Sequence, residues 1–496
     1  MGCSGIEYPM MVVANIGIFP HPAGRILSQG VVACIPDNHQ AREAMSEQNN
    51  NTQGAESGEQ SDSASRSKKG PKSVSRVAAF KTLNAVLLEG APLEDALSRA
   101  RKPIKDSRDK AFHRQLVMTV LRHHGELSSL LATFINREPK GQALAVLTVL
   151  KIGMAQALFL DVPVYAAAST SVDLVRRVGF SGHAKMVNAI MRRTAAEGDA
   201  HLAKMNATQL NTPEWLMASW VKAYGEETAN AIAAANLREP SLDLTVKSDP
   251  AHWAEAVGGV VLPTGSVRLR QSGPVEALPG FKDGEWWVQD AAATLPARLL
   301  GDVNGLRVAD ICSAPGGKTA QLVVSGGIVT SVDRSADRMK RLNENLKRLN
   351  LTAETVIADA TEWRPEKAFD AVLVDAPCTA TGTLRRHPDI ALNKSSRDVA
   401  SMVRLQASIL DNAIHMVRPG GKLVFCTCSL QPEEGPDLVA ALLARQTDVS
   451  LSPISPDDVH GMTNVITDKG YLRTLPHQGE EWGNWDGFFA ARFLIG

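Results

Sequence analysis

The chain has 496 residues, of which 44% are hydrophobic and 21% are charged, and its formal net charge is +0. This is the balance of a globular protein with roughly two to four domains, and it excludes binding of an anionic partner through overall charge alone. Six cysteines, at positions 3, 34, 312, 378, 426 and 428, suit neither a disulfide framework nor a paired zinc site, so we expect a reducing cytoplasm and no metal. No apolar run approaches the roughly 18–20 residues of a membrane span, and no signal peptide is recognisable, which predicts a soluble protein without a membrane partner.

Residues 1–72 are predicted to be a disordered or misassigned N-terminal extension. Residues 46–72, SEQNNNTQGAESGEQSDSASRSKKGPK, contain almost no large apolar side chains and cannot bury enough surface to offset the entropy of ordering. Residues 1–45 show no clear periodicity. They are either a tail or the product of a start codon assigned upstream of Met45, and the sequence leaves both open.

Helical signals run through residues 73–200, which we predict to be an all-α domain of roughly six helices. Phe80, Leu83 and Leu87 recur at three- and four-residue spacing, as one buried helix face requires. The run at 143–160, ALAVLTVLKIGMAQALFL, is apolar on nearly all sides and predicts a central helix. Glycine and proline interrupt the pattern and predict breaks at residues 90–92, 139–141, 163 and 179–182.

A local excess of basic residues marks the first third of this domain and the segment just before it. These residues are Arg66, Lys68, Lys69, Lys72, Arg76, Lys81, Arg99, Arg101, Lys102, Lys105, Arg108, Lys110, Arg114 and Arg122. Two interpretations remain open: a solvated helix surface, or a face that contacts the phosphates of a nucleic acid.

The remainder of the chain mixes strands with helices. Residues 205–295 combine a predicted helix, Pro213–Ala235, with strand-like runs such as LDLTVK and VRLRQ, which predicts a small α+β subdomain. In residues 296–496 the predicted strands LRVADICS, IVTSVDRS, ETVIADA, AFDAVLVDAP and GGKLVFCTCS alternate with helices. This alternation predicts a mostly parallel, doubly wound α/β domain of the Rossmann-like type.

A glycine-rich turn, DICSAPGGKT at 310–319, joins the first of these strands to a helix. Small residues allow a ligand to approach the backbone closely, and a helix N-terminus favours electron-rich groups. Acidic residues end the next three strands: Asp333 suits ribose hydroxyls, Asp359 suits an adenine edge, and Asp375 follows. The sequence therefore predicts a nucleoside cofactor at this edge of the sheet.

Two cysteines follow neighbouring strands beside this motif, Cys378 in DAPC and Cys428 in CTCS. Carbon 5 of cytosine is a poor nucleophile, so its methylation requires a thiolate that adds to C6, after which C5 attacks a sulfonium methyl group. Asp375 is placed to act as an acid near ring nitrogen N3. The pattern predicts covalent catalysis by the cysteine pair, whereas Cys312 and Cys426 are interpreted as buried core residues.

These motifs resemble those of the Nol1/Nop2/Sun RNA 5-methylcytosine methyltransferases, in DICSAPGGKT, VDRSADRMKRLNENLKRL, DAPCTATGTLRRHPDI and CTCSLQPEE. The resemblance implies Cys428 as the nucleophile, Cys378 as the residue that assists product release, and S-adenosyl-L-methionine as the cofactor. It also implies RNA rather than DNA as the substrate, because DNA cytosine methyltransferases use the earlier cysteine as nucleophile. The implied cofactor-binding residues are Cys312, Ser313, Ala314, Pro315, Gly316, Gly317, Lys318, Asp333, Arg338, Asp359 and Asp375. Ser313 departs from the alanine that is common in the family.

The front half narrows the resemblance. LFLDVPVYAAASTSVDLVRR and MVNAIMRR resemble the NusB-like RNA-binding domain that precedes the catalytic domain in bacterial members acting on 16S rRNA. The resemblance implies a NusB-like RNA-binding domain at 73–200, RNA recognition by the subdomain at 205–295, and a catalytic domain at 296–496. We therefore expect a monomer that methylates C5 of a cytosine in 16S rRNA.

Three alternatives remain open. The substrate could be tRNA or 23S rRNA, because a fold does not fix a substrate. The chain could be a non-catalytic RNA-binding or antitermination-type factor, although such a protein has no use for two positioned thiols. A small-molecule methyltransferase would in turn have no use for a basic helical domain.

Overall fold

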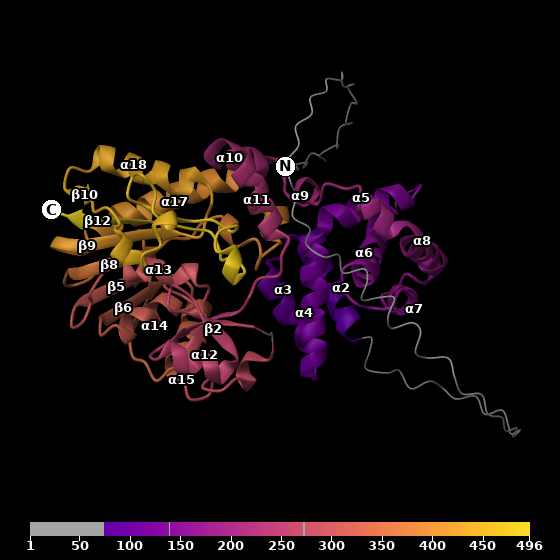
Figure 1. Ribbon diagram of the computed structural model, residues 1–496, viewed down its shortest axis with the longest axis horizontal. Helices are drawn as coiled ribbons and strands as arrows, with labels where there is room; N and C mark the ends of the chain where they lie inside the picture. The colour runs from indigo at the N-terminus through magenta and orange to yellow at the C-terminus, as the bar shows by residue number, and fades with distance from the viewer. Residues whose placement is uncertain (1–73, 138, 271–272) are drawn as a thin grey trace, which may run out of the picture. The chain divides into compact units, whose positions relative to one another are not determined.

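The computed structural model describes residues 74–137, 139–270 and 273–496 (Figure 1). The predicted extension, residues 1–72, lies outside the described residues, and so do four of its basic side chains, Arg66, Lys68, Lys69 and Lys72. In the described chain a helical domain is followed by three helices, a four-stranded sheet and an eight-stranded sheet with flanking helices.

Seven α-helices form the helical domain in the part of the chain that the structure describes. They are α2 (Val74–Glu89), α3 (Leu93–Arg101), α4 (Ser107–Arg122), α5 (His124–Phe134), α6 (Ala145–Leu158), α7 (Val164–Arg177) and α8 (Ala184–Leu202). The all-α prediction is confirmed, with one helix more than expected. The Asp106 side chain accepts a hydrogen bond from the Asp109 N–H and caps α4, and the non-helical backbone of His123 then separates α4 from α5.

The centre of this domain is α6, preceded by the short 3₁₀ helix η2 (Gly141–Leu144). Because η2 extends α6, the stretch Gly141–Leu158 reaches 18 residues with a mean hydropathy of 1.4, which is long and apolar enough to span a membrane by length and composition alone. The expectation that no apolar run approaches this length is therefore wrong. However, 56% of the stretch is buried. Val149, Leu150 and Ile152 are fully buried among the neighbouring helices. The stretch is therefore the central core helix that the sequence predicts.

Three helices lead toward the catalytic half: α9 (Ala207–Asn211), α10 (Glu214–Tyr224) and α11 (Glu226–Asn236). The prediction of one continuous helix over Pro213–Ala235 is wrong. The chain turns at Gly225, whose φ of 83° lies in the left-handed region that favours glycine. Leu216 and Trp220 are fully buried and share a hydrophobic core with Leu430 of the catalytic domain, so these helices are anchored on that domain.

A four-stranded antiparallel sheet follows, in the order β2-β3-β1-β4. Its elements are β1 (Asp243–Val246), α12 (Pro250–Val257), β2 (Gly259–Val261), β3 (Val267–Leu269) and β4 (Trp286–Val288). Leu244, Val267 and Trp286 are fully buried and form its core. Helices and short strands thus occur together here, as the sequence predicts.

The catalytic domain contains an eight-stranded sheet in the order β10-β12-β9-β8-β5-β6-β7, with β11 paired to β12. The strands are β5 (Arg307–Ile311), β6 (Ile328–Asp333), β7 (Glu354–Ile357), β8 (Phe369–Asp375), β9 (Val417–Thr427), β10 (Val449–Leu451), β11 (Leu472–Thr474) and β12 (Phe488–Ile495). Strands β5 to β9 are parallel, and β12 adds antiparallel pairs at one side. This confirms the mostly parallel α/β prediction.

Helices cover both faces of this sheet (Figure 1), with α17 (Ser396–Ile414) and α18 (Pro436–Arg445) on one side and α13 (Leu295–Arg298), α14 (Gly317–Val324) and α15 (Ala336–Arg348) on the other. The short α16 (Ile390–Asn393) precedes α17. Strand β5 lies between β6 and β8, so the chain reverses its winding direction there. Ligands of doubly wound sheets bind beyond the carboxyl ends of the strands at such a point.

Candidate active site

The glycine-rich loop connects β5 to α14 at this edge. Thr319 Oγ1 donates a 2.6 Å hydrogen bond to Oδ2 of Asp310, and burial raises the pKa of Asp310 to about 7. Gly316 has a φ of +98°, and a Cβ at this position would lie 2.9 Å from Cγ of Leu342. The turn therefore requires glycine, and it directs the first N–H groups of α14 toward the edge of the sheet.

Hydrogen bonds fix the carboxylate of Asp333, the last residue of β6. The Ala314 N–H donates to its Oδ2 at 3.3 Å, and the Ser335 N–H donates to its Oδ1 at 3.0 Å. Arg338 Nη1 lies 3.1 Å from the same Oδ2, and Nη2 of that guanidinium donates to the Ala314 carbonyl. Ser313 Oγ donates to the Val332 carbonyl at 3.3 Å. Loop and carboxylate thus hold each other in place.

One cavity brings together predicted cofactor residues from four strand ends. Its lining includes Cys312, Asp333, Arg338, Asp359 and Asp375. The exposed Asp359 accepts hydrogen bonds from the backbone N–H and hydroxyl of Thr361, and these bonds lower the pKa of Asp359. Pro315 is exposed and Gly317 begins α14, and neither lines the cavity.

Lys318 links the cofactor loop to the end of β8. Its Nζ donates a 2.8 Å hydrogen bond to Oδ2 of Asp375, and the lysine side chain is 8% exposed. Burial alone would lower the pKa of Lys318, but the charge of Asp375 and the hydrogen bond to it raise that pKa above the ordinary value. The Cys426 thiol approaches the other oxygen of Asp375 at 3.5 Å. Asp375 is therefore held from two sides.

The two predicted catalytic cysteines lie side by side, with 3.5 Å between their sulfur atoms. Cys378 follows β8 and Cys428 follows β9, and these two strands are parallel neighbours. The hydrogen bond with Cys428 and burial raise the pKa of Cys378 well above the ordinary thiol value. The Gly382 N–H donates to the Cys428 carbonyl at 2.9 Å, which joins the two cysteine segments through the backbone as well.

The other two described cysteines differ from this pair. Cys426 is fully buried in the sheet core, as its interpretation as a core residue requires, and burial raises its pKa well above the ordinary value. Cys312 has a φ of 61° and lines the cofactor cavity, and burial raises its pKa to about 12. Cys312 is thus partly buried against the core and also lines the cavity, so its interpretation as a buried core residue holds only in part. Neither thiol is poised to ionise near neutral pH.

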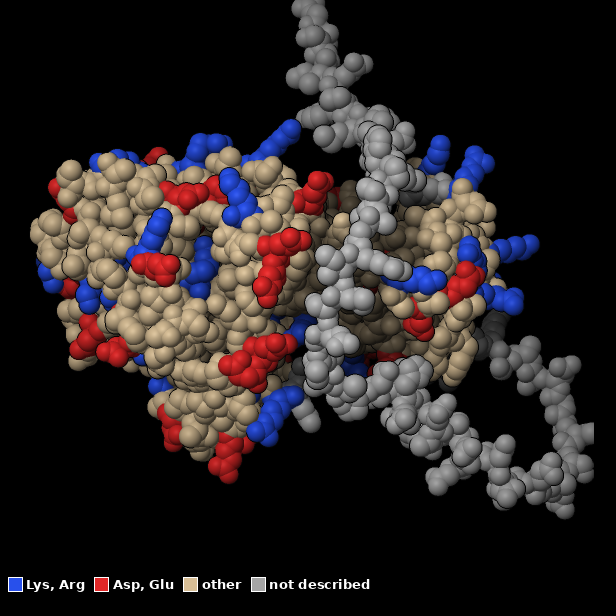
Figure 2. Space-filling model, turned by 45° about the horizontal axis from the view of Figure 1, so that its top comes forward, with Lys and Arg blue, Asp and Glu red and all other residues tan. Residues whose placement is uncertain are grey.

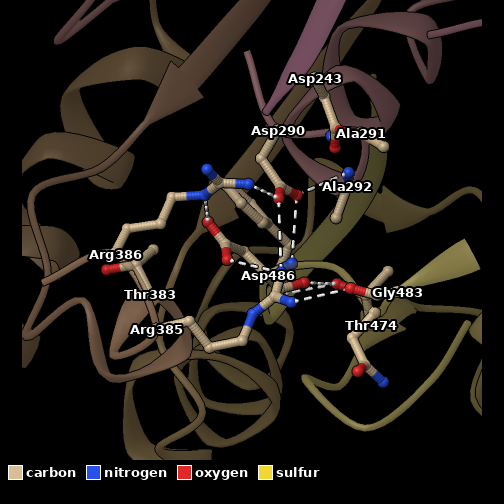
Figure 3. A network of polar contacts seen from close by, with 12 residues as sticks. Asp243, Asp290, Ala291, Ala292, Thr383, Arg385, Arg386, Thr474, Gly483 and Asp486 are labelled. Carbon is tan, nitrogen blue, oxygen red and sulfur yellow. Dashed lines mark hydrogen bonds and ion pairs between the residues drawn. The ribbon is translucent and has the colours of Figure 1, made fainter. Parts of the chain in front are cut away.

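A buried ion-pair network that the sequence did not predict holds the segment after Cys378. Figure 3 shows Arg385 and Arg386 directed toward Asp290 and Asp486. Arg386 lies 2.6 Å from Asp290 and 2.9 Å from Asp486, and Arg385 lies 3.2 Å from Asp486. Burial would raise the pKa of Asp290, but Arg386 and Arg385 together hold it below the ordinary value. The network joins this segment to the residues between β4 and α13 and to those before β12.

Glu434 and Gln406 form a second set of buried contacts that sequence reasoning missed. Glu434 is fully buried and accepts hydrogen bonds from Thr379 and Ser429, which directly follow Cys378 and Cys428. Gln406, on α17, donates to Glu434 at 3.0 Å. The only sequence signal was the position of Glu434 in CTCSLQPEE, where a second acid beside it offered no way to choose between the two.

The predicted basic face is partly exposed and partly buried. Arg101, Lys102 and Lys105 are exposed, whereas Arg122 is 8% exposed and donates a 3.0 Å hydrogen bond from Nη2 to the Arg385 carbonyl. Arg122 is therefore part of the contact between helical and catalytic domains rather than of a basic surface. In the view of Figure 2, the visible Lys and Arg side chains are dispersed among Asp and Glu side chains and are not gathered in one continuous patch.

In residues 74–137, 139–270 and 273–496, no group of three or more His, Cys, Asp or Glu side chains is arranged to hold a metal ion.

A Rossmann-like sheet with a glycine-rich loop and carboxylates at successive strand ends defines the class of S-adenosylmethionine-dependent methyltransferases. Residues 297–494 match the family described as 16S rRNA methyltransferase RsmB/F, and residues 73–196 match the NusB family. The chain belongs to the RsmB/F family of methyltransferases, with a NusB-like helical domain in front of the catalytic domain.

The alignments with known relatives extend over nearly the whole length of each relative. Ribosomal RNA small subunit methyltransferase B of Xylella fastidiosa (strain 9a5c) is 35% identical over 432 residues, which span 84% of this chain and 99% of the relative. The protein of the same name from Salmonella newport (strain SL254) is 34% identical over 441 residues, 84% of this chain and 98% of the relative. The crystal structure of PH0851 has a TM-score of 0.68 at 20% identity and covers 84% of this chain and 98% of that one, which shows a shared fold.

Proposed function

We propose that this chain transfers a methyl group to C5 of a specific cytosine in 16S rRNA through a covalent bond between Cys428 and C6 of the base. The observation that carries the proposal is the 3.5 Å separation of the Cys378 and Cys428 sulfur atoms, at adjacent strand ends beside the cofactor cavity. Two thiols in contact have no use in a methyltransferase that acts on an exocyclic amine. They suit a ring carbon, which must be activated by a covalent bond.

The cavity fits S-adenosyl-L-methionine by the chemistry of its lining. Asp333 and Asp359 offer carboxylate oxygens for ribose hydroxyls and an adenine edge, and Cys312 brings the start of the glycine-rich loop into the same lining. Bound there, the cofactor would supply an electrophilic methyl group.

The reaction at the base follows from the positions of three side chains. The Cys428 thiolate forms a bond to C6, and the electron pair of the C5–C6 double bond moves toward C5. Asp375 is proposed to contact N3, and the ammonium group of Lys318, which donates to Asp375 at 2.8 Å, is proposed to supply the proton that offsets the negative charge developing on the ring. Once C5 carries the methyl group, the C5 proton passes to solvent water as base, and the electron pair of the C5–H bond restores the C5–C6 double bond. The Cys428 sulfur then leaves C6 as the thiolate. Cys378, in contact with the Cys428 sulfur, assists this release.

The substrate assignment depends on the front half and on the relatives. The NusB-like domain and the small sheet at 243–288 are proposed to bind RNA around the target, and the chain is proposed to act as a monomer without metal. The named relatives act on small-subunit ribosomal RNA. A basic segment at the start of α4 supplies phosphate contacts.

The test is methyl transfer by the purified chain to total RNA from a strain lacking the enzyme, with bisulfite sequencing of the modified RNA. Protection of one 16S rRNA cytosine by the wild-type chain, and none by Cys428→Ala, is expected. Modification confined to tRNA or 23S rRNA would contradict the assignment of 16S rRNA as the substrate. Full activity of Cys428→Ala would contradict the assignment of Cys428 as the nucleophile.

A further inference from the structure

The carboxylate of Glu434 lies under both cysteine segments. Glu434 ends the short 3₁₀ helix η7 (Pro432–Glu434) and is fully buried. Four hydrogen bonds reach its two oxygens, and every one is donated to it: from the Thr379 N–H, the Thr379 hydroxyl, the Ser429 hydroxyl and the Gln406 amide. A group that only accepts is best satisfied as a carboxylate.

On the Cys428 side, Glu434 contacts both neighbours of the cysteine. The Thr427 hydroxyl donates to the Glu434 backbone carbonyl at 3.1 Å, and the Ser429 hydroxyl donates to the carboxylate at 2.5 Å. Both donors are fully buried. The backbone on each side of Cys428 is therefore fixed relative to one residue.

On the Cys378 side, Glu434 also holds both neighbours of the cysteine, one of them through Gln406. The Thr379 N–H donates to Glu434 at 2.9 Å. Gln406 donates to the Pro377 carbonyl at 2.8 Å and to Glu434 at 3.0 Å, so the residue before Cys378 is tied in through the amide. Both cysteines thus have each neighbour bound directly or through Gln406 to Glu434.

None of the salt bridges among residues 74–137, 139–270 and 273–496 includes Glu434, and the nearby buried guanidinium of Arg473 donates instead to the Ser429 carbonyl at 2.7 Å. A buried charge without an ion pair is costly, and hydrogen bonds alone must offset the desolvation. A fold that needed only a rigid turn would be served by a less costly apolar contact. The position is thus better explained by the reaction than by stability.

We propose that Glu434 is a positioning residue that sets the separation of the Cys378 and Cys428 sulfur atoms, and so the efficiency of attack and release at the base. This inference rests on the proposed function for its kinetic consequence but not for its geometric one. Misplacement of a reacting group by about 1 Å costs on the order of 100-fold in rate.

The kinetic experiment compares Glu434→Ala and Glu434→Gln with a matched control, Asp458→Ala. Asp458 is also a carboxylate of the catalytic domain that accepts from a backbone N–H and a hydroxyl, both of Ser455. Unlike Glu434 it is paired with an arginine, Arg492, and it touches neither cysteine segment. We expect Glu434→Ala to lose about 100-fold in kcat with an unchanged KM for the cofactor. Glu434→Gln, which keeps the side-chain length, should recover part of this loss, and Asp458→Ala should retain wild-type kcat.

The geometric experiment needs no RNA. Diamide oxidises two thiols in contact to a disulfide and is itself reduced. The folded protein is treated with diamide, and peptide mass spectrometry then measures the rate at which the Cys378–Cys428 disulfide forms. We expect Glu434→Ala to form this bond on the order of tenfold more slowly than wild type, with Asp458→Ala unchanged.

The two readouts separate the two claims. A wild-type chain without cytosine methylation refutes the proposed function, whereas the oxidation rates still decide the role of Glu434. Wild-type kcat and oxidation rate in Glu434→Ala would overturn the inference. If that variant does not fold, Thr379→Val and Ser429→Ala each remove one hydroxyl donor, and Ser455→Ala is their control. Both must then lower kcat, and wild-type values in both would overturn the inference equally.

Discussion

Lys318 and Asp375 join the two halves of the active site, because the Nζ of a lysine in the cofactor loop lies 2.8 Å from a carboxylate at the end of β8. Cys378 follows three residues after Asp375 in the chain. The cofactor loop and the first cysteine segment therefore share a buried ion pair, and a change at one reaches the other.

Lys318→Met tests this connection. The variant removes the cation and leaves Asp375, which is 32% exposed, without its partner. Loss of one member of a buried pair costs about 3–5 kcal/mol, and the partial exposure of Asp375 places the expected loss near 3 kcal/mol in urea denaturation. The rate of methyl transfer should fall more in Lys318→Met than in Lys318→Arg, because arginine retains the positive charge. Equal stability of Lys318→Met and wild type would contradict the pairing.

Cys378→Ala should separate attack from release. With Cys428 intact, the bond to C6 still forms, but release is slowed, so an RNA–protein adduct should accumulate and migrate as a retarded band in a denaturing gel. Cys428→Ala should give no such band, and neither should the double variant. The absence of any adduct from Cys378→Ala would remove the release role from that residue.

The ion-pair network of Figure 3 predicts a compensating pair of substitutions. Arg386→Leu leaves two buried carboxylates, Asp290 and Asp486, with only Arg385 beside them, and should cost about 3–5 kcal/mol. Adding Asp290→Asn removes one of the unpaired charges and should restore part of the loss. Thermal unfolding of the four chains in a double-mutant cycle measures this, and strict additivity would show that the charges do not interact.

Two buried histidines predict acid sensitivity of the helical domain. Burial lowers the pKa of both His113 and His124 to about 4, with smaller contributions from nearby cations. The unfolded chain binds protons below about pH 6.5 that the folded chain excludes, so stability is complete above that pH and falls as the pH drops toward 4. For the fully buried His113 the loss at pH 4 is roughly 3 kcal/mol. Hydrogen exchange of the α2 and α4 amides should reveal this loss of stability at low pH. The loss should be smaller in His113→Gln but unchanged in the exposed control His252→Gln.

The exposed cations before α4 predict a salt effect on RNA binding. Replacing Arg101, Lys102 and Lys105 with glutamine should make the dependence of log affinity on log salt shallower by about 2, because each phosphate contact in a single strand contributes roughly 0.7. The exposed lysines Lys367 and Lys469 on the catalytic domain serve as matched controls. An unchanged slope of log affinity against log salt in the triple variant would show that this segment is a solvated surface and not a phosphate-contacting one.

Much of the catalytic half was predictable because parallel strands end at one edge. Asp333, Asp375 and Cys428 are separated in the chain but directly follow or end strands, so the strand pattern alone places them together. Glu434 has no such signal, since its contacts depend on how η7 folds beneath two loops.

Errors arose where a local pattern met a tertiary constraint. Gly225 lies inside an otherwise helical pattern and ends a helix there, although one glycine in such a pattern is often tolerated. Arg122 belongs to a basic run in sequence, yet its side chain is buried against the Arg385 carbonyl, a contact that no charge count reveals.

The helical domain reaches the loop after Cys378 through Arg122 and through the Leu93 N–H, which donates to Asp389 at 3.4 Å. The first contact ends on a backbone carbonyl and makes no demand on the side chain at position 385, whereas the second needs an acceptor at position 389. In an exchange of domains between relatives, a transplanted helical domain must therefore bring a long donor to the place of Arg122, and the recipient must keep Asp389. A chimera that satisfies these two positions is therefore the one to build first.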